Sequence, residues 1–219
     1  MPSPNQTTAH APPADAYRAA SAHLANIDAD WARLVRQVGP CTHRPKPERE
    51  PYQALVRAVA YQQLHARAGD AILARLQALY RQTAFPSPQQ LLATDPATLR
   101  GCGFSARKVA TLQALAASAL QGLVPTRVAA ERLDDAELIA RLTTLPGIGR
   151  WTVEMLLIYT LERPDILPAD DFGVREGWRR LKSLPALPTR RQMEQAALPC
   201  RPWRTIAAWY LWRLPELAG

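Results

Sequence analysis

The chain has 219 residues, of which 47% are hydrophobic and 21% charged. A chain of this length can bury a sizeable core, and its composition argues against an intrinsically disordered protein. It contains no apolar run approaching the roughly 18–20 residues that cross a bilayer, which argues against a membrane-spanning protein. We therefore expect a soluble globular protein that needs no membrane.

The balance of charged residues is strongly basic, with a formal net charge of +8. Such a charge suits a polyanionic partner such as nucleic acid, although chains rich in alanine and arginine are often basic through codon usage alone. Residues 1–13 have neither a basic nor an apolar signal-peptide region and are interpreted as a disordered tail. The chain has three cysteines, Cys41, Cys102 and Cys200, which lie far apart in the sequence. Their odd number and wide spacing exclude a disulfide framework and predict a reducing compartment. We therefore expect a cytoplasmic location, with association with the nucleoid if the source is bacterial.

Apolar spacing typical of helices recurs along almost the whole chain, whereas no alternating strand pattern of useful length and no internal repeat is present. The sequence therefore predicts an all-α protein. Capping residues and prolines set the expected boundaries. The expected helical segments are 14–38, 52–80 as two helices separated near Gly69-Asp70, a helix opened by Asp95-Pro96, 106–120 capped by Ser105, a short helix from Asp134 to about Thr143, 150–162, 172–183 and 202–214.

Two of these helices show a clear buried face. Val109, Leu112, Ala116 and Leu120 share one side of the 106–120 helix, and five apolar or small positions from Val153 to Leu161 form a stripe on the next long helix. Just before the first of them, residues 101–106 match a dinucleotide-binding glycine pattern, but no strand precedes it and no acid follows at the required distance. We interpret these glycines as a helix end and turn.

The most informative stretch is 145–151, which reads Leu-Pro-Gly-Ile-Gly-Arg-Trp between two predicted helices. Gly147 and Gly149 allow a tight turn and leave backbone N–H groups uncovered at the start of the next helix, where an anion is favoured. Arg150 can add a charge-assisted contact to phosphate. The alternative is an ordinary turn between helices.

Several motifs together resemble the helix-hairpin-helix DNA glycosylase superfamily, and most closely the 3-methyladenine DNA glycosylase II family. They are Leu-Pro-Gly-Ile-Gly-Arg-Trp-Thr at 145–152 and Leu-Pro-Ala-Asp-Asp-Phe-Gly at 167–173. Further matches are Ala-Tyr-Gln-Gln-Leu at 60–64, Gly-Phe-Ser-Ala-Arg-Lys at 103–108, and Pro-Trp-Arg at 202–204 with Trp212. The resemblance covers roughly residues 50–214 and implies a two-lobed helical fold over residues 14–219, with the active-site cleft between two helical subdomains.

The resemblance implies that Asp171 is the catalytic residue, because the family's acid directly precedes a hydrophobic residue and a glycine. Asp170 is then a cap or a solvated neighbour, and the alternative for Asp171 is a helix N-cap. Related bifunctional lyases carry a lysine where this chain has Trp151, so a monofunctional hydrolase is expected, with water as the attacking group. The implied reaction is hydrolysis of the N-glycosidic bond of alkylated purines, chiefly 3-methyladenine and 7-methylguanine, flipped from duplex DNA.

The remaining site residues follow from the same resemblance and from base-flipping chemistry, in which an extruded base is held between aromatic faces. Trp212 is the expected stacking platform, with plain core packing as the alternative, and Gln63 fills the gap in DNA, with Leu64 as the fallback. The expected base pocket is Trp151, Met155, Phe172 and Trp212. The expected DNA contacts are Gln63, Leu64, Ser105, Lys108, Gly147, Gly149 and Arg150.

No cofactor is expected. The iron–sulfur cluster of endonuclease III relatives needs four clustered cysteines near the C-terminus, where this chain has only Cys200, and its four histidines lack the spacing of metal ligands. The resemblance does allow a monovalent cation at the hairpin backbone carbonyls. The expected partner is duplex DNA containing alkylated bases, bound by a monomer. The competing hypothesis is a non-catalytic helix-hairpin-helix protein that only binds DNA or senses alkylation damage.

Overall fold

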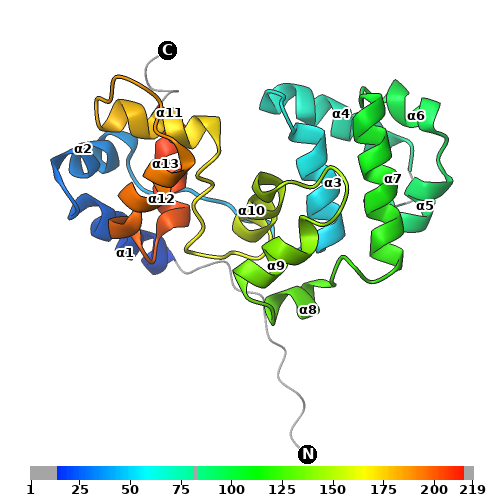
Figure 1. The fold of residues 1–219 in the computed structure, drawn as a ribbon, viewed down its shortest axis with the longest axis horizontal. Helices are drawn as coiled ribbons and strands as arrows, with labels where there is room; N and C mark the ends of the chain where they lie inside the picture. Colours follow the sequence, from blue (N-terminus) through cyan, green and yellow to red (C-terminus); the bar gives the residue numbers. More distant parts are fainter. Residues whose placement is uncertain (1–13, 81–82, 215–219) are drawn as a thin grey trace, which may run out of the picture. The chain divides into compact units, whose positions relative to one another are not determined.

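The computed structural model describes residues 14–80 and 83–214, and every regular element in these residues is a helix (Figure 1). The predicted all-α class is confirmed. The chain divides into two compact units: a central unit, Glu48–Leu161, and a terminal unit made of the described residues up to Pro47 and from Glu162 onward. The predicted tail, 1–13, lies outside the described residues. No helix in the described part of the chain is long and apolar enough to span a bilayer.

The central unit is a bundle in which capping side chains start most of the helices. Ser105 accepts a hydrogen bond from the Lys108 N–H, and Asp95 and Asp134 cap their helices in the same way, as predicted. The helices are α3 (Pro51–Tyr61), α4 (Ala66–Ala78), α5 (Pro88–Ala93), α6 (Pro96–Gly101), α7 (Ala106–Leu120), α8 (Arg127–Glu131), α9 (Asp135–Leu142) and α10 (Arg150–Tyr159).

Helix α3 lies at the centre of this unit and contacts α4, α7 and α10 (Figure 1). The stripe predicted from Val153 to Leu161 is buried throughout, which confirms it. On α7 the predicted face is buried at Val109, Leu112 and Ala116, but Leu120, the last residue of the helix, is 48% exposed. The packed α3–α7–α10 core fixes the hairpin that precedes α10.

The terminal unit packs helices from the N-terminal and C-terminal parts of the described chain into one aromatic-rich core. Trp31 and Trp178 meet edge to face with ring centroids 6.0 Å apart, and Tyr210 is fully buried in the same core. Gly177 allows α11 to approach α13, because a Cβ there would strike the Leu211 carbonyl. The elements are α1 (Ala14–Ala25), α2 (Ala29–Val38), α11 (Phe172–Leu181), α12 (Arg190–Ala196), the 3₁₀ turn η1 (Leu198–Cys200) and α13 (Arg204–Arg213).

Two predicted boundaries are wrong. The segment 14–38 is two helices, because the Asp28 side chain accepts a hydrogen bond from the Trp31 N–H and starts α2 after a three-residue break. The break expected near Gly69-Asp70 lies at residues 62–65 instead, and Gly69 is buried inside α4. A Cβ at Gly69 would strike the Tyr61 ring, so this glycine serves close packing rather than helix termination.

Three short helices lie outside the expected segments. Thr126 starts α8, and capping boxes start α5 (Ser87 with Gln90) and α12 (Thr189 with Gln192). All three are too short to show a helical period in the sequence. The turn predicted at residues 101–106 is confirmed: α6 ends at Gly101, and Gly103 has φ of 105°.

Candidate DNA-binding and catalytic site

The hairpin between α9 and α10 has the conformation that its glycines were expected to provide. Gly147 has φ of 76°, in the left-handed region that glycine favours, and a Cβ there would also strike the Thr111 side chain of α7. Leu145 and Ile148 are buried, whereas Pro146 and both glycines are exposed. The buried pair anchors the hairpin, and the exposed residues form its outer surface.

Gly149 is the N-cap of α10 and leaves the start of that helix open. A Cβ at Gly149 would meet nothing within 4 Å, and its φ of −89° is ordinary. The backbone N–H groups of Gly149 and Arg150 donate no hydrogen bond to any described residue. The Arg150 guanidinium is half-exposed and pairs with buried Glu154 over 2.8 Å. Open N–H groups at a helix start are compatible with an anion, and the predicted phosphate contact of this hairpin stays a prediction.

The turn between α3 and α4, residues 62–65, touches the hairpin. Gln62 Nε2 donates to the Gly147 carbonyl over 3.1 Å and to Thr152 Oγ1 over 3.0 Å. The next residue, Gln63, is exposed and has φ of 56°, a left-handed conformation that is uncommon for a residue with a side chain. Leu64 is also 42% exposed. Both residues predicted to fill a gap in DNA are therefore accessible, and their assignment stays a prediction.

Ser105 and Lys108 lie at the start of α7, and the structure gives each a contact within the protein. Ser105 caps the helix. Lys108 Nζ donates to the carbonyls of Ala60 and Gln62 over 3.0 and 2.9 Å. Partial burial lowers the pKa of Lys108. Their predicted contacts with DNA remain predictions.

Asp171 is the N-cap of α11, which was the alternative role considered for this residue. Its Oδ1 accepts a hydrogen bond from the Val174 N–H over 2.9 Å and a second from Trp212 Nε1–H over 2.8 Å. Capping and catalysis are compatible, because both donors fix the direction of the carboxylate. Asp170 is more exposed and lies 3.4 Å from Arg190, which is the solvated environment expected for it.

Trp212 is half-buried on α13 and lies against the start of α11. A Cβ on Gly173 would come within 2.8 Å of Trp212 Cδ1 and 3.2 Å of Asp171 Oδ1, so glycine is needed for the indole to reach the carboxylate. Phe172, on the same turn, is 68% exposed. Trp178 and Trp209, by contrast, are buried in the terminal core.

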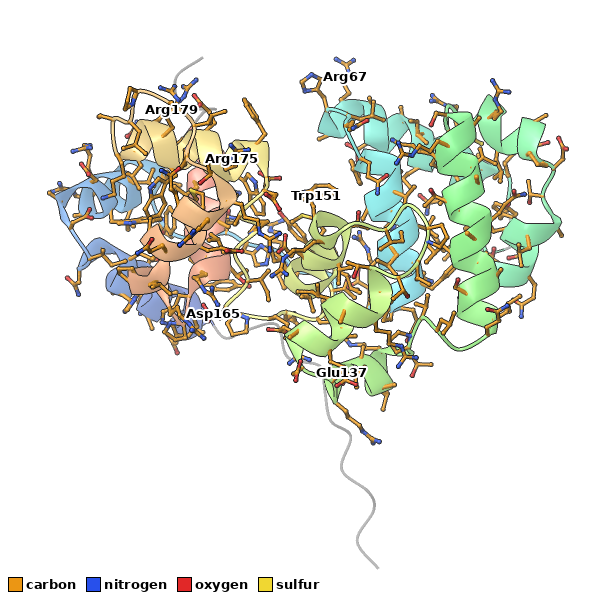
Figure 2. All side chains as sticks on the ribbon, in the orientation of Figure 1. Arg67, Glu137, Trp151, Asp165, Arg175 and Arg179 are labelled. Carbon is orange, nitrogen blue, oxygen red and sulfur yellow. The ribbon has the colours of Figure 1, made fainter. Side chains whose placement is uncertain are left out.

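The other two predicted pocket residues lie on α10 in the central unit. Trp151 projects from the first turn of α10 (Figure 2), and Met155 follows one turn later on the same face of the helix. Both are half-buried. Since Phe172 and Trp212 belong to the terminal unit, the single pocket formed by all four residues stays a prediction.

The described residues contain no group of three histidine, cysteine, aspartate or glutamate side chains arranged to hold a metal ion, and the three cysteines are free thiols. The hairpin carbonyls of Leu145 and Gly147 accept hydrogen bonds from the Ile148 N–H and from Gln62. A carbonyl oxygen has two lone pairs, so these contacts are compatible with a cation at the hairpin.

Three residues whose contacts support the hairpin and the Asp171 loop were not identified from the sequence. Gln62 was read only as a neighbour of Gln63, and Thr111 was not singled out. Asp165 was also missed: its carboxylate takes two hydrogen bonds from Arg204, Nε over 2.7 Å and Nη2 over 2.8 Å, which tie the start of α13 to the loop before Asp171. The nearest signal was the match at residues 202–204, which contains Arg204.

The chain is similar to known DNA repair proteins in sequence and fold. The family model for the HhH-GPD superfamily base excision DNA repair protein matches residues 56–202. DNA-3-methyladenine glycosylase 1 of Schizosaccharomyces pombe is 47% identical over 91% of this chain and 88% of its own length. A solved structure of the S. pombe 3-methyladenine DNA glycosylase in complex with abasic DNA has a TM-score of 0.88, covering 91% of this chain and 98% of that one. A crystal structure of a DNA-3-methyladenine glycosidase from Bacillus halodurans, 26% identical, has a TM-score of 0.75 with 90% of each chain covered. The protein belongs to the HhH-GPD superfamily of base excision DNA repair proteins.

Proposed function

We propose that this protein is a monofunctional DNA glycosylase that hydrolyses the N-glycosidic bond of alkylated purines, chiefly 3-methyladenine and 7-methylguanine, flipped from duplex DNA. The S. pombe relative is named for 3-methyladenine and its solved complex contains abasic DNA. Identity of 47% across nearly the whole chain supports the same reaction class here.

The observation that carries the proposal is the oriented carboxylate of Asp171. Cleavage of the bond between base and sugar develops positive charge on the sugar, as in glycoside hydrolysis. A carboxylate at about 4 Å in an effective dielectric near 20 stabilises that charge by about 4 kcal/mol, or roughly a thousandfold in rate. The Val174 N–H and the Trp212 indole fix its direction before substrate binds.

The rest of the reaction needs no amine nucleophile. The position after Gly-Ile-Gly-Arg is Trp151, so the sugar is attacked by water and the product is an intact abasic site. A cationic alkylated base leaves as a neutral molecule, and an aromatic wall such as Trp212 binds the cationic form through the ring quadrupole. The hairpin at 145–151 supplies the phosphate contact that holds the duplex, without reading its sequence.

Mass spectrometry of bases released from methylated duplex DNA tests the reaction directly. The unaltered protein is expected to release 3-methyladenine and 7-methylguanine, and Asp171→Asn is expected to lose at least about a hundredfold in rate while it still binds DNA. Asparagine is as good an N-cap as aspartate, so this substitution removes the charge and keeps the start of α11. Asp170→Asn is the matched control and is expected to be mild.

The competing function is binding or sensing of damage without cleavage. A pure binder gains nothing from a carboxylate at its DNA surface, because the charge repels the polyanion. If the protein binds methylated duplex and releases no base, the glycosylase proposal is wrong. If it releases bases and Asp171→Asn has no effect on the rate, the catalytic assignment of Asp171 is wrong.

Three further properties belong to the same proposal. The partner is duplex DNA with alkylated bases, bound by a monomeric enzyme. The enzyme acts in the compartment that holds the DNA, the cytoplasm, with nucleoid association if the source is bacterial. A monovalent cation at the carbonyls of residues 145–148 would add positive charge beside the N–H groups at the start of α10.

A further inference from the structure

Lys108 is a basic side chain next to the expected DNA surface, but its ammonium group is turned toward the protein. Two of its three N–H groups donate to the carbonyls of Ala60 and Gln62, at the end of α3. These carbonyls belong to a helix terminus, where the last C=O groups lack helical partners and a cation is favoured. Ser105, which caps α7, places Lys108 in the first turn of that helix.

The α3–α4 turn, residues 62–65, also contacts the hairpin. Gln62 offers its carbonyl to Lys108 and uses its side chain to contact the Gly147 carbonyl and Thr152 Oγ1. One residue therefore connects the start of α7, the end of α3 and the hairpin. All these groups belong to the central unit.

Gln63, the residue after Gln62, has a backbone conformation that needs the support of these contacts. Gln63 has φ of 56°, and a non-glycine residue persists in this conformation only where its surroundings impose it. The Gln63 side chain makes no hydrogen bond to any described residue and is exposed beside Leu64. The Leu64 N–H donates to the Tyr61 carbonyl over 3.0 Å and closes the turn across Gln63. The side-chain contacts that hold this closed turn against the rest of the unit are those of Lys108 and Gln62, one residue away.

We propose that Lys108 is a positioning residue, which holds the α3–α4 turn so that Gln63 and Leu64 project toward DNA, and that it is not a phosphate contact. This inference rests on the proposed function, since it assumes that the turn enters a gap in duplex DNA. It replaces the direct DNA contact expected for Lys108 from the sequence. Partial burial of its ammonium, with two carbonyl partners, supports a role inside the protein.

The two roles predict different salt dependence. A lysine that neutralises a phosphate contributes about 0.9 to the slope of log affinity against log salt concentration, and its removal weakens binding to all duplexes alike. A lysine that positions the turn contributes nothing to that slope. Its removal lowers the preference for DNA that offers a gap.

The experiment measures binding by fluorescence anisotropy, over a range of salt, to an undamaged duplex and to one with a tetrahydrofuran abasic site. Lys108→Met keeps the aliphatic stem and removes the donors, and Gln62→Met cuts the same network on the hairpin side. Arg107→Met is the matched control, because it removes the same charge from the same turn of α7. Arg107 is exposed and makes no hydrogen bond or ion pair with a described residue.

Lys108→Met and Gln62→Met are each expected to lose about tenfold or more of the preference for the abasic duplex, with salt slopes unchanged within about 0.3. Arg107→Met is expected to keep the preference. A slope that falls by about 0.9 in Lys108→Met with the preference intact would show a phosphate contact and overturn the proposal. No change in either quantity would also overturn it, as would the absence of any preference in the unaltered protein.

If Lys108→Met does not fold, as seen by circular dichroism, Gln62→Met decides by the preference for the abasic duplex alone, because glutamine carries no charge that could change the salt slope. An unchanged preference in Gln62→Met then overturns the proposal. Base release from methylated DNA is measured separately on the unaltered protein. Failure to release bases together with a normal abasic preference would refute the proposed function and leave the role of Lys108 standing.

Discussion

Substitution of Trp212 by phenylalanine separates the two roles that the structure gives this side chain. Phenylalanine keeps a ring on α13 but cannot donate the hydrogen bond that Nε1 makes to Asp171 over 2.8 Å. A hydrogen bond to a charged acceptor is worth about 1.5–3 kcal/mol, so excision of every lesion should slow by about ten- to one-hundredfold. A desolvated cation–π contact is worth about 2 kcal/mol, and phenylalanine retains part of it, so a cationic lesion should lose several-fold more.

The assay is single-turnover excision of cationic 7-methylguanine and of a neutral base that the unaltered protein also releases, hypoxanthine or ethenoadenine. The same substitution in the Asp171→Asn background completes a double-mutant cycle. If Trp212 acts through the Asp171 carboxylate, its effect on the neutral base should shrink markedly in that background. Trp209→Phe is the control, because Trp209 lies three residues earlier on α13 and is buried in the core.

Three results would refute this reasoning. Equal losses for both bases together with a lowered melting temperature, as expected of Trp209→Phe, would make Trp212 a core residue. Effects that add fully in the double-mutant cycle would separate Trp212 from the carboxylate. A rate within about twofold of the unaltered protein would mean that the hydrogen bond does not contribute to catalysis.

The remaining predictions concern the hairpin, the covalent chemistry and the loop before α11. Gly149→Val should weaken binding to damaged and undamaged duplexes alike, since no protein atom opposes a side chain there; a loss confined to damaged DNA would place the turn in the base pocket. Borohydride should trap no enzyme–DNA adduct, because Trp151 replaces the lyase lysine, and a substantial trapped band would mean that another amine reaches the sugar. Burial raises the pKa of Asp165, but the hydrogen bonds and charge of Arg204 outweigh burial and lower this pKa overall. The ion pair therefore stabilises the fold fully above about pH 4, and this stabilisation is lost as the pH falls through the lowered pKa. Asp165→Asn should therefore lower the melting temperature at pH 7 and much less at pH 2–3; an equal loss at both would refute the electrostatic account.

Helix starts were predictable wherever a capping residue and a long apolar face occur together. Ser105 and Asp134 are examples, since a cap acts on N–H groups two or three residues away. The breaks at residues 26–28 and 62–65 were missed because neither contains a proline or glycine. The break predicted near Gly69 was wrong because glycine is needed there for close packing against the Tyr61 ring and not for a turn of the backbone.

In the candidate site, too, the local motifs could be predicted from the sequence and the long-range contacts could not. The hairpin and the Asp171 loop are short continuous motifs, so their chemistry can be read from neighbouring residues. The residues that support them act across the fold: Lys108 contacts the Ala60 carbonyl of α3 from 48 residues away, and Gln62 contacts Thr152 from 90. No period or local pattern encodes such contacts, which depend on how α3, α7 and α10 pack.

Two pairs of adjacent, chemically identical residues show how the fold assigns roles that sequence alone leaves ambiguous. Gln62 follows the last turn of α3 and points back to the hairpin, whereas Gln63, with φ of 56°, lies on the exposed side of the turn. Asp170 stays at the surface near Arg190, whereas Asp171 begins α11 and meets the Trp212 indole. In each pair adjacent positions have different contacts and exposure, so an insertion or deletion in either loop should be far more damaging than a substitution within it.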